Sequence, residues 1–235
     1  MDIYEDAWSK ELINAPDHIM VAGRTGAGKS TVINNMIYSI LCSSPDEHMM
    51  VLIDPKIVEF DLYKGTPYCM DYAETPDDIL KTLKICYNFA HARYESLRGT
   101  GKKTYEGTKV HIFVEELMSI MLGKDRANQE ARRYLILLFA LARAANIQII
   151  VATQCPLSKV IPTELKVNCG VIIGLQTRNA QDSRNILDVA GCEKLPRHGQ
   201  ALVSDPDQQD IYKKNLMMVE EKHIHELIDW RMAGN

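Results

Sequence analysis

A glycine-rich string near the start of the chain fits the pattern GxxxxGK(S/T), and its residues are Gly23, Arg24, Thr25, Gly26, Ala27, Gly28, Lys29, Ser30 and Thr31. It lies between a short apolar run at 18–22 and a helix-like stretch at 29–42, which is the context that the pattern requires. Glycine lets consecutive backbone N–H groups turn toward one point, and the start of the following helix adds its positive dipole end. The string therefore predicts a phosphate-binding loop in an α/β fold.

Two side chains of this loop predict its ligands. Lys29 would place a cation on the β- and γ-phosphates, and Ser30 would offer its hydroxyl to Mg²⁺. We therefore expect ATP and Mg²⁺ as cofactors, with the phosphates held by residues 23–31. The alternative, a glycine-rich turn with a chance lysine, is disfavoured by the strand before the loop and the helix after it.

Short apolar runs alternate with longer helical runs along the whole chain. Strands are predicted at 18–22, 49–53, 110–114, 147–152, 170–175 and 200–203, and helices at 29–42, 76–97, 128–144 and 220–231. Strands that are apolar on both faces and separated by helices indicate a mostly parallel central sheet flanked by helices. Residues 98–108 and 195–199 are expected to be loops. No internal repeat or linker interrupts the pattern, so we expect one domain over 1–235, with its core at 16–203 and a surface helix at 220–231.

Two carboxylates follow directly after the apolar run at 110–114. In P-loop hydrolases the first acid at such a strand end is usually near the Mg²⁺ shell, and the second polarises the attacking water. We therefore assign Glu115 to the metal and Glu116 to the water. The alternative is two solvated glutamates at a helix start, but such acids rarely follow a buried strand directly.

A polar pair, Thr153 and Gln154, follows another buried run in the same way. Gln154 is in a position to hydrogen-bond a phosphate or the attacking water, which would couple hydrolysis to movement. A simple turn at the end of the strand is the alternative.

Charge and cysteine usage exclude several classes of protein. The formal net charge of −4 argues against a protein whose whole surface coats nucleic acid, although a basic strip in a pore or groove remains compatible with it. None of the six cysteines forms a CxxC or other close metal-ligand pair, which favours reduced thiols in a cytoplasmic protein. No apolar run approaches the ~20 residues that a membrane-spanning helix needs, and no signal stretch opens the chain.

Several longer blocks resemble the FtsK/SpoIIIE family of DNA translocases. Residues 16–30 are similar to the family's P-loop region, and Ile53-Asp54-Pro55-Lys56 with Glu59 and Tyr63 resembles its IDPK…E…Y block. The remaining blocks follow in the family's order at 115–121, 143–156, 182–188 and 191–195. The resemblance covers most of the chain, from about 16 to 203.

This resemblance implies a RecA-like P-loop motor domain that assembles as a homo-hexameric ring around double-stranded DNA, with ATP between neighbouring subunits. Arg143 and Arg184 then become candidates for reaching a neighbour's nucleotide; a surface ion pair is the alternative for each. Lys56 and Glu59 match the family's pattern without an assigned role, and a buried ion pair is their alternative.

The chain departs from the family pattern at four positions. Glu115 replaces an aspartate and Cys155 an arginine, while Ile172 and Gln176 stand where the family often has arginines. These changes bear on signalling between subunits rather than on nucleotide binding. The chain also lacks the family's membrane anchor and winged-helix module, so we expect a fragment or a divergent member from a mobile element.

The function that the resemblance implies is ATP-driven movement of double-stranded DNA in chromosome segregation or conjugative transfer. It would take place in the bacterial cytoplasm, at the inner membrane face through a tether or partner outside this chain. A protein-secretion ATPase and a nucleotide-binding scaffold with little turnover are the alternatives. The pairs Lys102-Lys103 and Arg132-Arg133 are candidate phosphate contacts on DNA, with a solvated charged face as the alternative.

Overall fold

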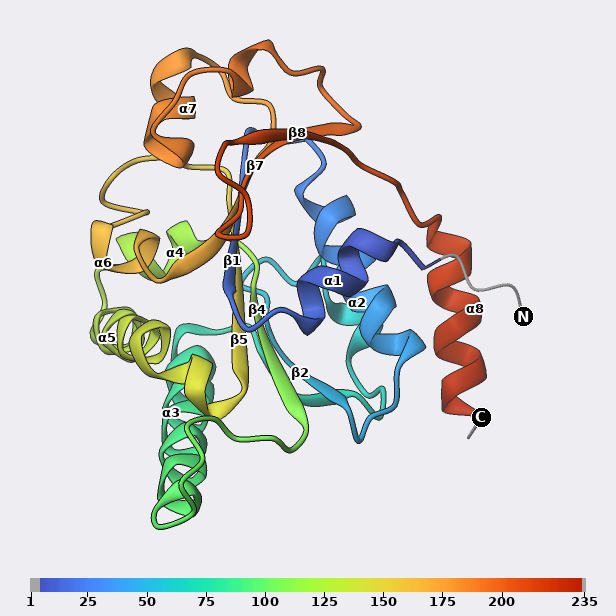
Figure 1. Ribbon diagram of the computed structural model, residues 1–235, viewed down its shortest axis with the longest axis vertical. Helices are drawn as coiled ribbons and strands as arrows, with labels where there is room; N and C mark the ends of the chain where they lie inside the picture. Colours follow the sequence, from blue (N-terminus) through green and yellow to red (C-terminus); the bar gives the residue numbers. More distant parts are fainter. Residues whose placement is uncertain (1–4, 234–235) are drawn as a thin grey trace.

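A central eight-stranded sheet runs through the computed structural model, which describes residues 5–233 (Figure 1). Its strand order is β3-β2-β4-β5-β1-β6-β7-β8. The strands β1 to β6 pair in parallel, whereas β7 pairs with β6 and β8 with β7 in antiparallel fashion. The predicted mostly parallel sheet is therefore confirmed. The strands are β1 His18–Ala22, β2 His48–Ile53, β3 Cys69–Ala73, β4 Lys109–Val114, β5 Ile147–Thr153, β6 Cys169–Gly174, β7 Gln200–Ser204 and β8 Tyr212–Asn215.

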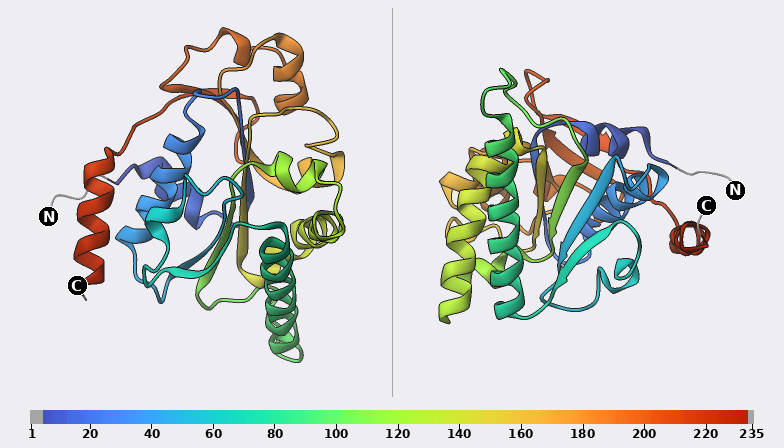
Figure 2. Two further views of the ribbon diagram at one scale, coloured as in Figure 1. Left: turned by 180° about the vertical axis from the view of Figure 1, so that it is seen from behind. Right: turned by 90° about the horizontal axis from the view of Figure 1, so that it is seen from below.

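Helices cover both faces of this sheet, as the view from below in Figure 2 shows. The helices α3, α4, α5 and α7 pack on one face, and α1, α2 and α8 pack on the other. The helices are α1 Ala7–Asn14, α2 Lys29–Cys42, α3 Pro76–Leu97, α4 Leu117–Leu122, α5 Arg126–Leu141, α6 Thr163–Lys166, α7 Ala180–Leu187 and α8 Glu221–Met232, and short 3₁₀ turns lie at Asp61–Tyr63, Ala142–Ala145 and Cys192–Lys194. Between residues 5 and 233, no helix is both long enough and apolar enough to cross a bilayer.

The central strand β1 explains why this fold has two cores. All five of its residues are buried, and successive side chains of a strand point to opposite faces. Ile19 and Val21 therefore join the core beneath α1, α2 and α8, while Met20 and Ala22 join the core beneath α3 and α5. A strand that is buried at every position requires helices on both sides.

Most predicted elements are present within a few residues of their expected bounds. The helix predicted at 128–144 begins earlier, at Arg126, because Asp125 caps it and accepts from the Asn128 N–H. It ends at Leu141, and a 3₁₀ turn follows. That 1–235 form one domain stays a prediction, and 1–4 and 234–235 lie outside the described residues.

Six elements lacked a prediction: strands β3 and β8, and helices α1, α4, α6 and α7. Strands β3 and β8 are edge strands, and β8 is polar throughout (Tyr-Lys-Lys-Asn), so neither carries the buried apolar run that reveals a central strand. The four helices have between four and eight residues, too few for a helical period to stand out.

A buried polar network joins the amino ends of three strands. His48 Nδ1 and His111 Nε2 lie 2.9 Å apart, and His111 Nδ1 lies 2.9 Å from Gln148 Oε1. Gln148 Nε2 then donates to the carbonyls of Leu12, Ala15 and Asp17, at distances of 2.8, 3.1 and 2.7 Å. The network ties the end of α1 to the sheet.

Burial lowers the pKa of His48 and His111 in this network and so favours neutral imidazoles, and the same holds for the nearby His18. Burial lowers the pKa of His18 to about 3 and holds the pKa of His111 well below its usual range. His18 Nδ1 accepts from the Ile149 N–H at 3.1 Å, which a protonated ring could not do.

We expect the folded state to weaken in acid through His18. A base whose pKa is lowered by folding contributes stability above its ordinary pKa of 6.5, and that stability is lost as pH falls toward 3. Between about pH 6.5 and 4.5, wild type should lose roughly 2–3 kcal/mol more unfolding free energy than His18→Asn, whose amide oxygen replaces the acceptor. Urea unfolding over this range measures the difference. The exposed His91→Asn should follow wild type, and parallel curves for all three proteins would contradict the prediction.

Candidate nucleotide-binding site

The glycine-rich loop connects β1 to α2 at the carboxyl edge of the sheet. Gly26 and Gly28 have φ angles of 72° and 100°, which are unfavourable for residues with a side chain. A β-carbon on Gly23 would stand 2.7 Å from Leu175 Cβ, so this position also requires glycine. The Gly23 N–H donates to the Thr153 carbonyl at 3.2 Å, and the Arg24 N–H donates to the Gln176 carbonyl at 2.9 Å. The loop is thus attached to the ends of both neighbouring strands.

Lys29 holds the loop from inside. Its Nζ donates to the carbonyls of Gly23 at 3.0 Å and Arg24 at 3.2 Å. Burial lowers the pKa of Lys29, and the nearby carboxylates of Glu115 and Glu116 partly oppose this shift. Lys29, the residue predicted to contact the phosphates, therefore lies at the loop. The predicted acids Glu115 and Glu116 are close enough to balance its positive charge.

Glu115 is the first of the two acids that follow β4. Its N–H donates to the Ile53 carbonyl at 2.9 Å and so extends the pairing with β2. Its carboxyl group is buried, and Oε2 has no hydrogen-bond partner among residues 5–233. Burial, reinforced by the nearby Glu59, raises the pKa of Glu115 to about 7. A buried carboxylate oxygen without a partner is ready to accept a ligand.

Glu116 is more fully buried, and both of its oxygens have partners. Oε2 accepts from Lys56 Nζ at 2.9 Å, and Oε1 accepts from Thr153 Oγ1 at 3.3 Å. Its backbone is left-handed (φ 61°), a conformation that costs a residue with a side chain ~1–3 kcal/mol. The chain thus turns sharply between β4 and α4, and Glu116 occupies the turn.

Asp54 organises the loop that carries Lys56 and Glu59. Its side chain is fully buried and accepts from five backbone N–H groups. These belong to Lys56 (3.2 Å), Ile57 (3.1 Å), Val58 (3.0 Å), Glu59 (2.9 Å) and Phe60 (3.0 Å). Ile57 is forced to a φ of 58°, which is rare for a β-branched residue. The aspartate fixes the course of residues 55–60.

Gln154 contacts the loop directly, because its Oε1 accepts a short hydrogen bond from Thr25 Oγ1. A cavity of about 480 Å³ opens beside this contact and is lined by Arg24, Thr25, Gln154, Cys155 and Arg178. Cys155 thus lies at this cavity. The other two substituted positions lie elsewhere: Ile172 is buried in the sheet, and Gln176 donates to the Leu195 carbonyl at 2.7 Å.

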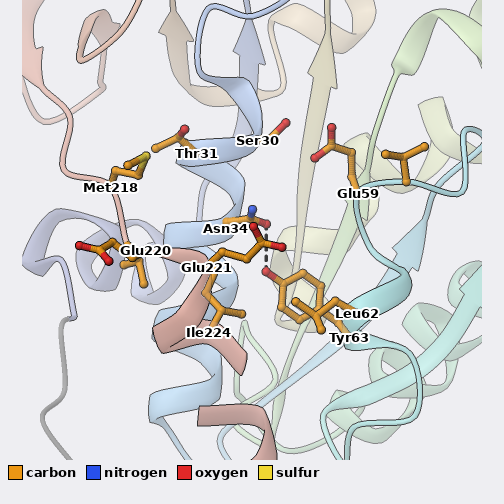
Figure 3. A pocket seen from close by; sticks show the side chains of 12 residues that line it. Ser30, Thr31, Asn34, Glu59, Leu62, Tyr63, Met218, Glu220, Glu221 and Ile224 are labelled. Atoms are coloured by element: carbon orange, nitrogen blue, oxygen red, sulfur yellow. Dashed lines mark hydrogen bonds between the residues drawn. The ribbon is translucent and has the colours of Figure 1, made fainter. Parts of the chain in front are cut away.

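A second cavity, of about 660 Å³, lies beside Ser30 and Thr31 (Figure 3). Residues from three parts of the chain line it: Asn34 of α2, Glu59, Leu62 and Tyr63 beyond β2, and Met218, Val219, Glu220, Glu221 and Ile224 near the C-terminus. The Tyr63 hydroxyl donates to Asn34 Oδ1 at 2.9 Å across its floor. The cavity is continuous with the start of α2.

Asn35 attaches the C-terminal wall of this cavity to α2. Its Nδ2 donates to the Met217 carbonyl at 2.8 Å, and its Oδ1 accepts from the Val219 N–H at 3.1 Å. Helix α8 continues from this segment and buries Ile224, Leu227 and Ile228 in the core that it shares with α1 and α2.

The two predicted interface arginines do not join this cluster. Arg143 pairs with Asp17 at 2.9 Å, just before the amino end of β1 and therefore at the opposite edge of the sheet. Arg184 is exposed on α7. The structure brings together Lys29, Glu115, Glu116 and Gln154 around the loop that contains Ser30 and Thr31.

Two arginines near the loop had no prediction: Arg178, which lines the cavity beside Gln154, and Arg197. Arg197 lies in the segment 195–199, and its Nη2 stands 3.0 Å from the position that a β-carbon on Gly26 would take. Its guanidinium therefore covers the middle of the glycine-rich loop. This approach joins segments about 170 residues apart, and no local pattern signals it.

The residues present fit a magnesium ion. Mg²⁺ prefers oxygen ligands, and it is usually held by one or two carboxylates together with phosphate oxygens. The Ser30 hydroxyl and the unpartnered Glu115 oxygen offer such ligands. Within the described part of the chain, no group of three His, Cys, Asp or Glu residues could hold a metal alone. The donor set thus suits a metal that arrives with the nucleotide.

The buried Glu115 should make the nucleotide-free protein less stable at high pH. A carboxyl group whose pKa is raised by folding contributes stability below its ordinary pKa of 4.5, and this is lost as pH rises through about 7. In EDTA at pH 8, Glu115→Gln should therefore be more stable than wild type by roughly 3 kcal/mol, and at pH 5 the difference should fall to about 1 kcal/mol. Urea unfolding at both pH values measures this. The exposed Glu106→Gln is the control, and a difference that does not change with pH would refute the expectation.

Curated proteins are similar to most of this chain. DNA translocase SpoIIIE of Bacillus subtilis (strain 168) is 35% identical over 211 residues, which are 81% of this chain and 26% of the relative. DNA translocase FtsK of Sporosarcina ureae is 34% identical over 222 residues, which are 86% of this chain and 28% of the relative. The chain thus spans about a quarter of the length of these relatives.

Solved structures share the fold. The conjugation coupling protein TcpA of pCW3, in a monomer form with ATPγS, superposes with a TM-score of 0.82 at 23% identity, covering 94% of this chain and 65% of that one. The cytoplasmic domain of the type VII secretion ATPase EccC of Thermomonospora curvata gives 0.75 at 19% identity, covering 93% and 28%.

The sequence profile of the FtsK/SpoIIIE family matches residues 1–194, which include the glycine-rich loop, both strand-end acids and Gln154. The chain belongs to the FtsK/SpoIIIE family.

Proposed function

We propose that this chain is an ATPase motor that moves double-stranded DNA and works as a homo-hexameric ring. The observation that carries the proposal is the grouping of Lys29, Glu115, Glu116 and Gln154 around one phosphate-binding loop in a member of the FtsK/SpoIIIE family. The curated relatives at 34–35% identity are named DNA translocases, which supports DNA as the moving substrate.

In this proposal the loop binds the phosphates of ATP through its backbone N–H groups. Lys29 exchanges the carbonyls of Gly23 and Arg24 for phosphate oxygens. Ser30 and Glu115 would hold Mg²⁺, which when bound neutralises charge on the phosphates. The cavity of about 660 Å³ beside Thr31 has a volume suited to the ribose and base.

Glu116 accepts a proton from the attacking water, and Gln154 orients that water or the terminal phosphate. The carboxylate of Glu116 is buried and held on both oxygens, so it needs little rearrangement before the reaction. Arg197 adds positive charge over the loop from the same chain.

Arg184 is exposed and free to act on a neighbouring subunit's nucleotide in the ring. Arg143 already has a partner in Asp17, so a role at a neighbour's site would require it to leave this ion pair. For DNA contacts, Lys102 is paired with Glu106, and Arg132 donates to the Gly123 carbonyl at 3.3 Å. The Lys102 ion pair supports the solvated-face alternative for that residue, whereas Arg132 is half-buried and its Nε has no hydrogen-bond partner among residues 5–233.

We place the motor in the bacterial cytoplasm, held at the inner membrane face by segments or partners outside this chain. Movement of polypeptide is the second candidate, because the secretion ATPase EccC shares the fold. Its identity to this chain is 19%, against 35% for SpoIIIE of Bacillus subtilis, so DNA is the better supported substrate.

Duplex DNA should stimulate ATP hydrolysis by the assembled protein. We expect a stimulation of about tenfold that weakens as salt rises from about 50 to 200 mM, because phosphate contacts release counterions. Lys29→Ala should abolish turnover with and without DNA. Steady-state ATPase assays, paired with a mass measurement in ATP to detect a hexamer, provide the test. If the rate of ATP hydrolysis is the same with and without duplex DNA across this salt range, the main support for a DNA motor is removed.

Glu116→Gln should separate binding from hydrolysis. The amide keeps the shape of the side chain but cannot accept the proton, so kcat should fall by about 10²–10⁴ while ATP still binds. Binding of a fluorescent ATP analogue and steady-state turnover measure the two effects. Glu130→Gln is the matched control, because Glu130 also pairs with a lysine, Lys84, but on the surface. Normal turnover in Glu116→Gln would show that another group activates the water.

A further inference from the structure

Lys56 connects the loop after β2 to the acid predicted to activate water. Its Nζ lies 2.9 Å from Glu116 Oε2, although 60 residues separate the two in the sequence. The two side chains differ sharply in exposure, 42% for Lys56 and 1% for Glu116. The ammonium is therefore partly exposed to solvent, whereas the carboxylate that it contacts is almost completely buried.

The backbone that carries Lys56 is fixed independently of this ion pair. Asp54 accepts from the N–H groups of Lys56 and of the four residues that follow it. These contacts set the start of the Lys56 side chain opposite the end of β4, where Glu116 lies. The ion pair thus joins two points that the fold already holds in place.

The contacts of Glu116 define the orientation of its carboxylate. Lys56 occupies Oε2, and the Thr153 hydroxyl, 3.3 Å away, occupies Oε1. One partner on each oxygen fixes the plane of the group, and without Lys56 only the single hydroxyl would remain. Lys29 does not replace it, because its Nζ donates to the carbonyls of Gly23 and Arg24.

We propose that Lys56 is a positioning residue for ATP hydrolysis: its ammonium holds the Glu116 carboxylate in the orientation that accepts the proton of the attacking water. This inference rests on the proposed function. The side-chain contact of Lys56 is with Glu116, and Lys56 is not part of the glycine-rich loop, so its removal should affect kcat and leave nucleotide binding nearly unchanged. A misplacement of about 1 Å in a reacting group can cost about 10²-fold in rate.

The test compares Lys56→Met, Lys56→Gln and Lys56→Arg with Lys84→Met. Lys84 is the matched control, because it also pairs with a glutamate (Nζ–Oε2 3.0 Å) and its side chain is 40% exposed. It lies on α3, however, and its partner is Glu130 of α5 rather than a residue of the site. We expect Lys56→Met and Lys56→Gln to lower kcat by about ten- to a hundredfold, with KM and the affinity for a fluorescent ATP analogue within about threefold of wild type. Lys56→Arg should restore most of the rate, since it keeps the cation, and Lys84→Met should match wild type.

Three outcomes would overturn the proposal. Lys56→Met and Lys56→Gln with the wild-type kcat would show that the ion pair does not matter, and a raised kcat would show that it restrains Glu116. Loss of nucleotide binding in all three Lys56 variants would indicate a structural role. The Glu116→Gln variant tests the proposed function independently of Lys56. If Glu116→Gln is inactive and Lys56→Met has normal activity, only the positioning role of Lys56 is wrong.

Discussion

Strand β1 lies between β5 and β6 with all of its residues buried, and the position of the whole site depends on this constraint. The glycine-rich loop starts where β1 ends, and two backbone hydrogen bonds hold its first residues to the ends of the neighbouring strands. A parallel sheet collects the carboxyl ends of its strands at one edge. The loop, the acids after β4 and Gln154 after β5 therefore meet at this edge.

Several charged side chains lie close together at this edge of the sheet, and most of them have little contact with solvent. Lys29, Lys56, Glu59, Glu115 and Glu116 influence one another electrostatically, and three of the five are buried. Glu116 is stabilised by a lysine and a hydroxyl, whereas Glu115 keeps an oxygen without a protein partner. The two adjacent glutamates thus have different environments, which favours different tasks for them.

The sequence predicted these parts to different degrees, for physical reasons. The helices at 29–42 and 76–97 and the strand at 18–22 were predicted with the observed bounds, because long apolar or periodic segments indicate the helices and a short continuous apolar run that ends at a glycine indicates the strand. The loop and the strand-end polar residues followed from the same pattern. The Lys56–Glu116 pair and the approach of Arg197 to Gly26 depend on how distant segments pack, and no local period records that. Arg143 was matched to a family block, but its ion pair with Asp17 is visible only in three dimensions.

The two hydrogen bonds of Asn35 make the last part of the chain a wall of the cavity beside Thr31. The family profile stops at residue 194, before β7, β8 and α8. A protein cut at that boundary would keep the glycine-rich loop, both strand-end acids and Gln154. It would nevertheless expose β6 as a bare sheet edge, uncover the apolar face of α2 and open one side of the cavity. The stretch of sequence that the family profile matches is therefore smaller than the physical unit that encloses this cavity.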